Sequence, residues 1–120
     1  MKVKSYQELR VWQNSMKLTT KIYQITKCFP KDETYGLTAQ MRRSAVSVPS
    51  NIAEGQGRAS RGEFKQFLCM ARGSLFELET QFLLAKRLGY VSEKETLEVD
   101  AALADVAPVL NALIRSLNDN

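Results

Sequence analysis

The sequence predicts an all-α protein, an antiparallel up-down-up-down four-helix bundle. Apolar residues recur at steps of three and four through four segments, which is the period of a helix with one buried face. The breaks between these segments are short, so consecutive helices must run in opposite directions. The 120 residues are expected to form one domain, residues 1–120, with helices at about 6–28, 33–55, 61–88 and 93–117.

Local start and stop signals support these boundaries. Ser5, Ser60 and Ser92 are each followed three residues later by Glu, which is the capping-box pattern. In that motif the serine oxygen accepts a hydrogen bond from the third amide, and the glutamate bonds back to the serine amide. Pro30 ends the first helix, because a residue that precedes proline disfavours the helical conformation. Gly89 is expected to cap the third helix.

Each segment has one stripe of residues that should face the core. These are, in chain order, Leu9, Trp12, Met16, Thr19, Ile22 and Tyr23; Leu37, Met41, Ala45, Val48 and Ile52; Phe64, Phe67, Leu68, Ala71, Leu75, Leu78, Phe82 and Ala85; and Val99, Leu103, Val106, Leu110, Leu113, Ile114 and Leu117.

Three residues interrupt the helical patterns. Pro49 lies inside the second stripe, which predicts one kinked helix whose loosened backbone groups are helped by Ser47 and Ser50. Pro108 predicts a kink or a local break in the fourth helix. Gly73 lies mid-helix, where glycine costs about 1 kcal/mol relative to alanine. The usual reason for such a glycine is the close approach of another helix backbone.

Composition excludes most catalytic chemistry. The chain has no histidine, which removes the commonest general base and most zinc and haem sites. No phosphate-binding loop, nucleophile–base pair or metal-ligand set is visible, so we expect no enzyme, no cofactor, no metal and no small-molecule substrate. No segment is apolar enough to span a membrane, and no export signal is recognised. A cytoplasmic protein with two free, buried thiols, Cys28 and Cys69, is therefore expected.

Charge is unevenly distributed. The first 31 residues hold seven Lys or Arg and one Glu, whereas residues 93–120 hold six acidic and two basic residues. Either oppositely charged helices or subunits lie side by side, or the basic part binds a polyanion such as RNA.

Residues 41–57 combine more position-specific residue types than any other stretch. Arg42 and Arg43 are about 100° apart on a helix, so at most one can point inward. They could form ion pairs, contact phosphate or lie in a subunit interface. Glu54, Glu63, Glu77 and Glu79 are expected to pair with nearby arginines. The outward set proposed for nucleic-acid or subunit contacts is Arg42, Arg43, Ser47, Asn51, Glu54, Arg58 and Arg61.

The chain resembles the family of 23S rRNA intervening-sequence proteins, also called the S23-type ribosomal protein family. The block Gln-Met-Arg-Arg-Ser-Ala-Val-Ser-Val-Pro-Ser-Asn-Ile-Ala-Glu-Gly at 40–55 carries most of the resemblance. Segments 9–13, 29–30 and 33–38 add to it, as do Arg58, Ser60, Glu63-Phe64, Phe67-Leu68, Ala71, Gly73-Ser74-Leu75, Glu77-Leu-Glu79 and Leu88-Gly-Tyr90.

The resemblance implies a left-handed bundle and a homo-oligomer. The family and the similar accessory proteins of diversity-generating retroelements look like ring-shaped pentamers. It implies no activity and no catalytic residue. We therefore expect a non-enzymatic oligomer that binds rRNA or a ribonucleoprotein through a basic surface. The alternative is an assembly scaffold with no nucleic-acid role.

Overall fold

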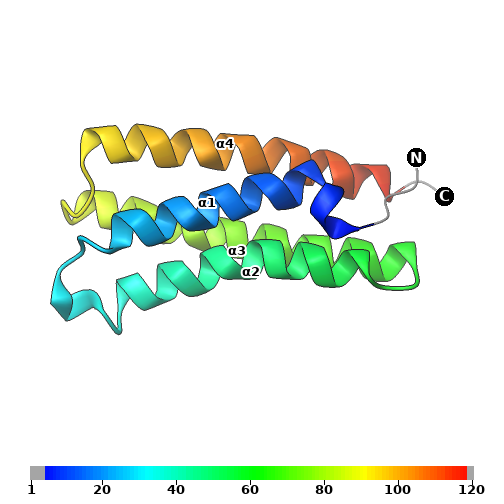
Figure 1. The fold of residues 1–120 in the computed structure, drawn as a ribbon, viewed down its shortest axis with the longest axis horizontal. Coiled ribbons are helices and arrows are strands. Elements are labelled where there is room, and N and C mark those ends of the chain that lie inside the picture. Colours follow the sequence, from blue (N-terminus) through cyan, green and yellow to red (C-terminus); the bar gives the residue numbers. More distant parts are fainter. Residues whose placement is uncertain (1–4, 119–120) are drawn as a thin grey trace.

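Four helices run along one long axis in the computed structural model, which describes residues 5–118. They are α1 (Arg10–Thr26), α2 (Leu37–Gln56), α3 (Arg61–Arg87) and α4 (Glu93–Ser116). Figure 1 shows that their directions alternate along the chain, so the all-α, up-down-up-down prediction is confirmed. The handedness stays a prediction.

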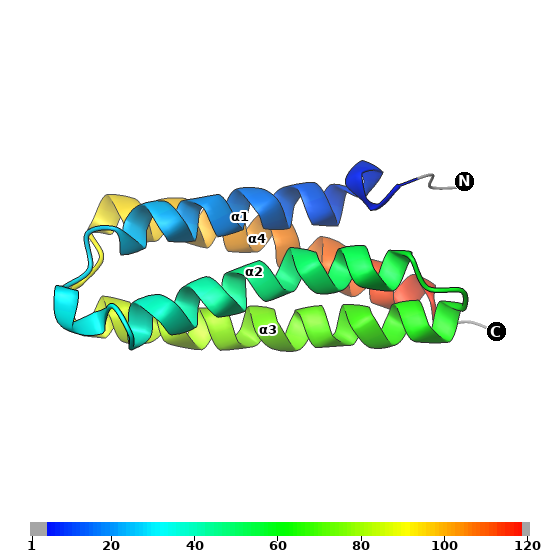
Figure 2. The same ribbon diagram turned by 60° about the horizontal axis from the view of Figure 1, so that its bottom comes forward.

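The helices form a four-cornered bundle. Each helix contacts its neighbours in sequence, and α1 also contacts α4, which closes the arrangement. Helices α2 and α3 share the most extensive contact and lie side by side in Figures 1 and 2. Lys21 of α1 and Glu98 of α4 form an ion pair at 3.3 Å. The basic first helix thus lies beside the acidic last helix, as one of the two interpretations of the charge pattern expected.

The buried stripes of α2, α3 and α4 are confirmed, although Phe64, Phe67, Leu113 and Leu117 are only partly buried. Of the stripe predicted for α1, Ile22 is buried, Leu9, Trp12 and Thr19 are partly buried, and Met16 and Tyr23 are exposed, so the prediction is wrong at the last two. The core residues of this helix are Val11, Ser15, Leu18, Ile22, Ile25 and Thr26.

The stripe predicted for α1 lies one residue further along the chain than the stripe that is buried, which corresponds to a rotation of about 100° around the helix axis. Met16 and Tyr23 are 41% and 39% exposed, because they lie about 100° around the helix from the buried stripe. A 3₁₀ turn (Tyr6–Glu8) precedes α1, so the helix begins at Arg10 and later than predicted. Neighbouring apolar stripes have the same period, and only packing against α2 and α4 selects one of them.

The helix caps agree in part with the serine patterns. Ser92 and Glu95 form the complete capping box at α4. Ser60 Oγ accepts from the Glu63 amide at α3, whereas Ser5 Oγ accepts from Gln7 within the 3₁₀ turn. A second 3₁₀ turn, Lys31–Glu33, delays the start of α2 to Leu37.

Both interior prolines lie in continuous helices, so α2 is one helix as predicted and the break considered for α4 does not occur. Proline at 49 leaves the Ala45 carbonyl without its usual amide donor. Thr19 Oγ1 of α1 lies 3.0 Å from that carbonyl oxygen and 2.8 Å from the Ser15 carbonyl oxygen in its own helix, so its single hydroxyl hydrogen is shared between the two acceptors. The expectation that Ser47 and Ser50 would help is not met, since Ser47 bonds to α3 instead.

A similar contact lies near the second proline. Asn14 Nδ2 of α1 donates to the Asp105 carbonyl, three residues before Pro108, at 3.0 Å. Polar side chains of α1 therefore reach the backbone of α2 and α4 close to each proline. At Ala45 the α1 donor replaces the amide that Pro49 lacks, whereas the carbonyl that Pro108 leaves without an amide donor is that of Ala104, and Asp105 is its neighbour.

Glycine positions differ from expectation. A Cβ built on Gly73 would meet nothing within 4 Å, so no helix of this chain approaches it. Gly55 is the close-contact glycine, since a Cβ there would lie 2.6 Å from Phe67 Cβ. Gly89 has φ +79° and caps α3 as predicted. Both cysteines are free, but Cys28 is exposed and Cys69 half-buried, because neither lies on a core stripe.

Candidate interaction surfaces

Arg42 is the inward-turned member of the arginine pair. Its Nε donates to Thr26 Oγ1 at 2.9 Å, and its guanidinium lies 4.6 Å from the centre of the Tyr23 ring. Both partners lie in the last turns of α1, which has no basic residue of its own there. The positive charge of Arg42 therefore stabilises the negative end of the α1 dipole.

Arg58 and Arg61 also contact their own chain. Arg58 pairs with Glu54 at 2.6 Å and lies 4.8 Å from the centre of the Phe67 ring. Arg61 donates to the carbonyl oxygen of Ser116, the last residue of α4, at 3.0 Å. Arg61 thus stands at the end of α4 as Arg42 stands at the end of α1.

Ser47 and Asn51 belong to a polar contact between α2 and α3. The hydroxyls of Ser47 and Ser74 lie 2.8 Å apart. Asn51 Nδ2 donates to the Ser47 carbonyl at 2.8 Å and to its hydroxyl oxygen at 2.9 Å. These side chains are half-buried or buried, and they align the two helices with each other.

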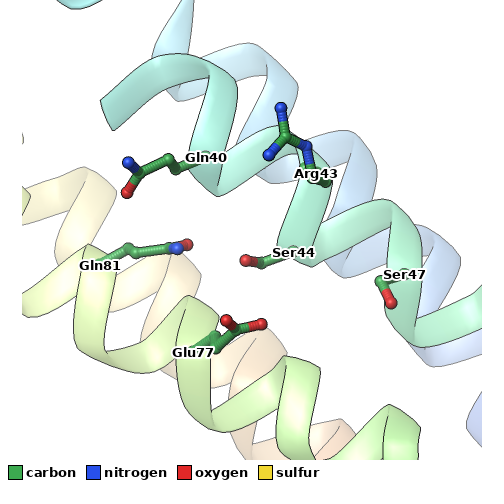
Figure 3. A pocket seen from close by; sticks show the side chains of 6 residues that line it. All are labelled: Gln40, Arg43, Ser44, Ser47, Glu77 and Gln81. Atoms are coloured by element: carbon green, nitrogen blue, oxygen red, sulfur yellow. The ribbon is translucent and has the colours of Figure 1, made fainter. Parts of the chain in front are cut away.

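Arg43 is exposed and has no hydrogen bond or ion pair with any described residue. It stands at the rim of a cleft of about 440 Å³ between α2 and α3. Figure 3 shows the six lining side chains, Gln40, Arg43, Ser44, Ser47, Glu77 and Gln81. The structure thus separates the arginine pair: Arg42 packs on α1, and Arg43 is left open.

The seven residues expected to make external contacts do not share one open patch. Three of the four arginines bond to their own chain, and Ser47 and Asn51 lie between helices. Of the expected carboxylate–arginine pairs, the structure forms the Glu54–Arg58 pair.

An exposed apolar stripe, which sequence reasoning missed, runs along the outside of α3. We call it the α3 stripe, and it comprises Gly73, Phe76, Leu83, Leu84 and Leu88. Its four large side chains are 49–55% exposed. Their spacing follows one face of the helix, turned away from the core stripe. Exposed apolar residues of this density are typical of an interface.

A second apolar surface lies between α1 and α2. It is a groove of about 330 Å³ that we call the α1–α2 groove. Its lining residues are Tyr6, Trp12, Met16, Thr19, Val46, Pro49, Ser50 and Ala53. Trp12 and Met16 belong to the stripe that was expected in the core, so the sequence signal was apolar but its role was misassigned.

One hydrogen-bonded carboxylate joins the two loops at the same end of the bundle. Glu33 Oε1 accepts from the Leu37 amide at 3.0 Å, and Glu33 Oε2 accepts from the Tyr90 hydroxyl at 2.9 Å. These bonds, the Leu37 bond first, lower the pKa of Glu33. The bond to Glu33 in turn raises the pKa of Tyr90.

No three or more Cys, Asp or Glu side chains come together as a metal site within residues 5–118. None of the helices in that range is long and apolar enough to cross a membrane.

The family model for the 23S rRNA-intervening sequence protein matches residues 7–112. The chain belongs to this family. The match includes nearly all of the four helices, and it confirms the resemblance seen in the 40–55 block.

A solved relative has the same fold. It is a protein of unknown function from the S23 ribosomal protein family of Bacteroides thetaiotaomicron, with a TM-score of 0.72 and 21% identity. The alignment covers 91% of this chain and 99% of that one. No curated protein matches the sequence. Membership in the 23S rRNA-intervening sequence protein family thus establishes ancestry and architecture, and the activity must be argued from the surfaces.

Proposed function

We propose that this protein is a non-enzymatic scaffold that assembles with copies of itself through the α3 stripe. The observation that carries the proposal is Gly73. Glycine in a helix interior costs about 1 kcal/mol relative to alanine, and no atom of residues 5–118 lies close enough to Gly73 to require it. A close neighbour from another chain accounts for it, because glycine lets two backbones approach.

The side chains around Gly73 support the same conclusion. Phe76 and Leu84 lie on the same side of α3, one turn before and after Thr80, and each is about half exposed. Burying such a side chain is worth about 1.5–3 kcal/mol. Because about half of each side chain is already buried, a partner that covers these two residues would gain about half of that value from each, or about 1.5–3 kcal/mol in total.

The α1–α2 groove supports a second copy as the partner. It is concave and apolar, and it shares no residue with the α3 stripe. A projecting surface on one copy that fits a hollow on the next gives a head-to-tail contact, and such contacts close into rings when the rotation allows. The resemblance to pentameric proteins makes a five-membered ring the expected form.

Light scattering on the full chain tests this proposal. Wild type should be larger than a monomer, and Phe76→Asp or Leu84→Asp should reduce it to monomers. Leu97→Asp is the matched control, because Leu97 is 67% exposed on α4 and lies outside both surfaces. A wild type that is monomeric at tens of micromolar, or one that Phe76→Asp leaves assembled, would contradict the proposal.

RNA binding is the second proposed role, supported by a different observation. Arg10, Lys17, Lys27 and Lys31 are exposed and form no ion pair with any described residue. A ring would repeat this basic surface in every subunit, and an rRNA or ribonucleoprotein partner would place the protein in the cytoplasm. Binding to 23S rRNA fragments should weaken steeply with salt and with Lys17→Glu. Binding that is flat with salt would count against this role.

A further inference from the structure

The cleft between α2 and α3 has no role in the scaffold proposed above. Its lining is polar throughout: two amides (Gln40, Gln81), two hydroxyls (Ser44, Ser47), one guanidinium (Arg43) and one carboxylate (Glu77). Its volume, about 440 Å³, lies in the range of small-molecule sites. Polar linings of this kind bind by hydrogen bonds and charge, so the unpaired groups decide which ligand fits.

Three of these groups lack partners. Gln81 Oε1 is buried and accepts no hydrogen bond, although buried polar atoms are nearly always paired. Arg43 and Glu77 form no ion pair with any residue from 5 to 118. In Figure 3, Arg43 stands on the α2 side of the cleft, and Glu77 and Gln81 extend into it from α3. Arg43 and Glu77 are exposed and open to a ligand, and Gln81 Oε1 is the buried atom without a donor, so the cleft can take an acceptor at Arg43 and donors at Glu77 and Gln81.

This arrangement selects among ligand classes. A divalent cation would meet one carboxylate and an opposing arginine, which is a poor ligand set. A phosphate group or a nucleic-acid backbone would be attracted by Arg43 but repelled by Glu77. A small molecule that carries both a carboxylate and an ammonium matches both walls, because each group meets an opposite charge.

We propose that the cleft binds a free α-amino acid, with its carboxylate on Arg43 and its ammonium on Glu77 and Gln81 Oε1. The carboxylate can accept two hydrogen bonds from the guanidinium, and the ammonium has three donors to satisfy the acceptors opposite. The ligand joins α2 to α3, so binding raises the thermal stability of the chain. The site shares no residue with the α3 stripe or the α1–α2 groove, but it adjoins the stripe, since Gln40, Glu77 and Gln81 also line a hollow with Gly73, Phe76 and Leu84. A partner on the stripe would therefore cover part of the cleft, and binding is tested on a stripe variant as well as on the wild type.

Calorimetry and thermal-shift measurements with the twenty common L-amino acids test the site. Acetate, methylammonium and inorganic phosphate serve as probes that carry only one of the two charges. At least one amino acid should bind with one site per chain and raise the unfolding temperature in proportion to its concentration. The single-charge probes should bind at least about tenfold more weakly, since each lacks one charged hydrogen bond.

Variants distinguish the cleft from other surfaces. Arg43→Gln, Glu77→Gln and Gln81→Leu should each weaken binding about tenfold or more, whereas Lys17→Gln should not. Arg43 and Glu77 make no bond within the described chain, so their variants should fold, and circular dichroism confirms that. Measurements on Leu88→Asp, a change in the α3 stripe outside the hollow that Phe76 shares with Glu77 and Gln81, separate this result from the state of assembly.

The proposal is overturned if no amino acid binds, if phosphate binds more tightly than every amino acid, or if the cleft variants bind as wild type does. The scaffold proposal can fail while this one stands, because binding is also measured on Leu88→Asp, in which the α3 stripe is disrupted and the cleft is unchanged.

Discussion

Gly73→Ala separates the stability of one bundle from the stability of the assembly. Gly73 lies mid-helix in α3, and a Cβ there would have no neighbour within 4 Å. The added methyl therefore causes no clash within the chain and removes the conformational freedom of glycine in the unfolded state. The free energy of unfolding of the monomer should rise by about 1 kcal/mol.

In the assembly the same methyl should act in the opposite direction. If a neighbouring helix lies against Gly73, the Cβ holds the two backbones apart and weakens every contact along the α3 stripe. We expect a more stable monomer that associates more weakly. Urea denaturation in the monomeric Phe76→Asp background measures the first effect, and sedimentation equilibrium of the otherwise wild-type chain measures the second.

Gly62→Ala is the matched control. Gly62 lies in the first turn of the same helix, and a Cβ there would make only an ordinary contact, at 4.0 Å from Ser60 Oγ. It should leave association unchanged. Should Gly73→Ala associate as tightly as Gly62→Ala does, the explanation of Gly73 by a second chain is wrong. A loss of monomer stability in Gly73→Ala would show that the space around it is not open.

Three further predictions concern the bundle itself. Thr19→Val removes the donor to the Ala45 carbonyl and should lower the free energy of unfolding by about 1 kcal/mol. Thr20→Val is the control, because the Thr20 hydroxyl bonds only within α1. Urea denaturation measures both variants, and an equal loss of stability would refute the role given to Thr19. Gly55→Ala should be destabilising overall. A Cβ 2.6 Å from Phe67 Cβ costs about 1–3 kcal/mol, whereas the better helix propensity of alanine contributes about 1 kcal/mol. An unfolding temperature equal to or above that of wild type would contradict this. The Glu33 carboxylate has a lowered pKa in the folded state, so its stabilisation is fully present above its ordinary pKa of 4.5 and is lost as the pH falls through the folded value. Glu33→Gln should therefore be less stable than wild type at pH 7, and this difference in the free energy of unfolding should become smaller as the pH falls. A difference that is constant from pH 7 to pH 3 would count against this linkage.

The α1 stripe shows where periodicity stops being informative. Val11, Leu18 and Ile25 form one apolar series, and Trp12 and Met16 belong to another that is about 100° away. Both have helical spacing, so neither is preferred by pattern alone. In the structure α2 and α4 cover the first series, and the second lines the α1–α2 groove.

The arginines of residues 41–61 show a similar limit. Their charge and helical position suggested an external surface. Arg42 and Arg61 instead lie at the carboxyl ends of α1 and α4, because those ends are brought next to them by the antiparallel arrangement. No local pattern reveals a partner that lies 16 or 55 residues away.

The cleft was missed for the same reason. Arg43 and Gln40 come from α2, and Glu77 and Gln81 come from α3, with more than 30 residues between the two sets. Each residue alone resembles an ordinary solvated side chain. Only the register of α2 against α3, aligned by the Ser47–Ser74 bond, brings opposite charges to one hollow.

The sequence by itself determined the helices, their order, the cores of α2, α3 and α4, and the family. These follow from short-range rules, since a 3.6-residue period, a serine cap and a short loop each act within a few residues. The tertiary structure alone decided which face of α1 is buried, which arginine is open and what lies beside each proline and glycine. Those outcomes depend on contacts between distant helices, where the direction of a side chain is set by the neighbour it meets.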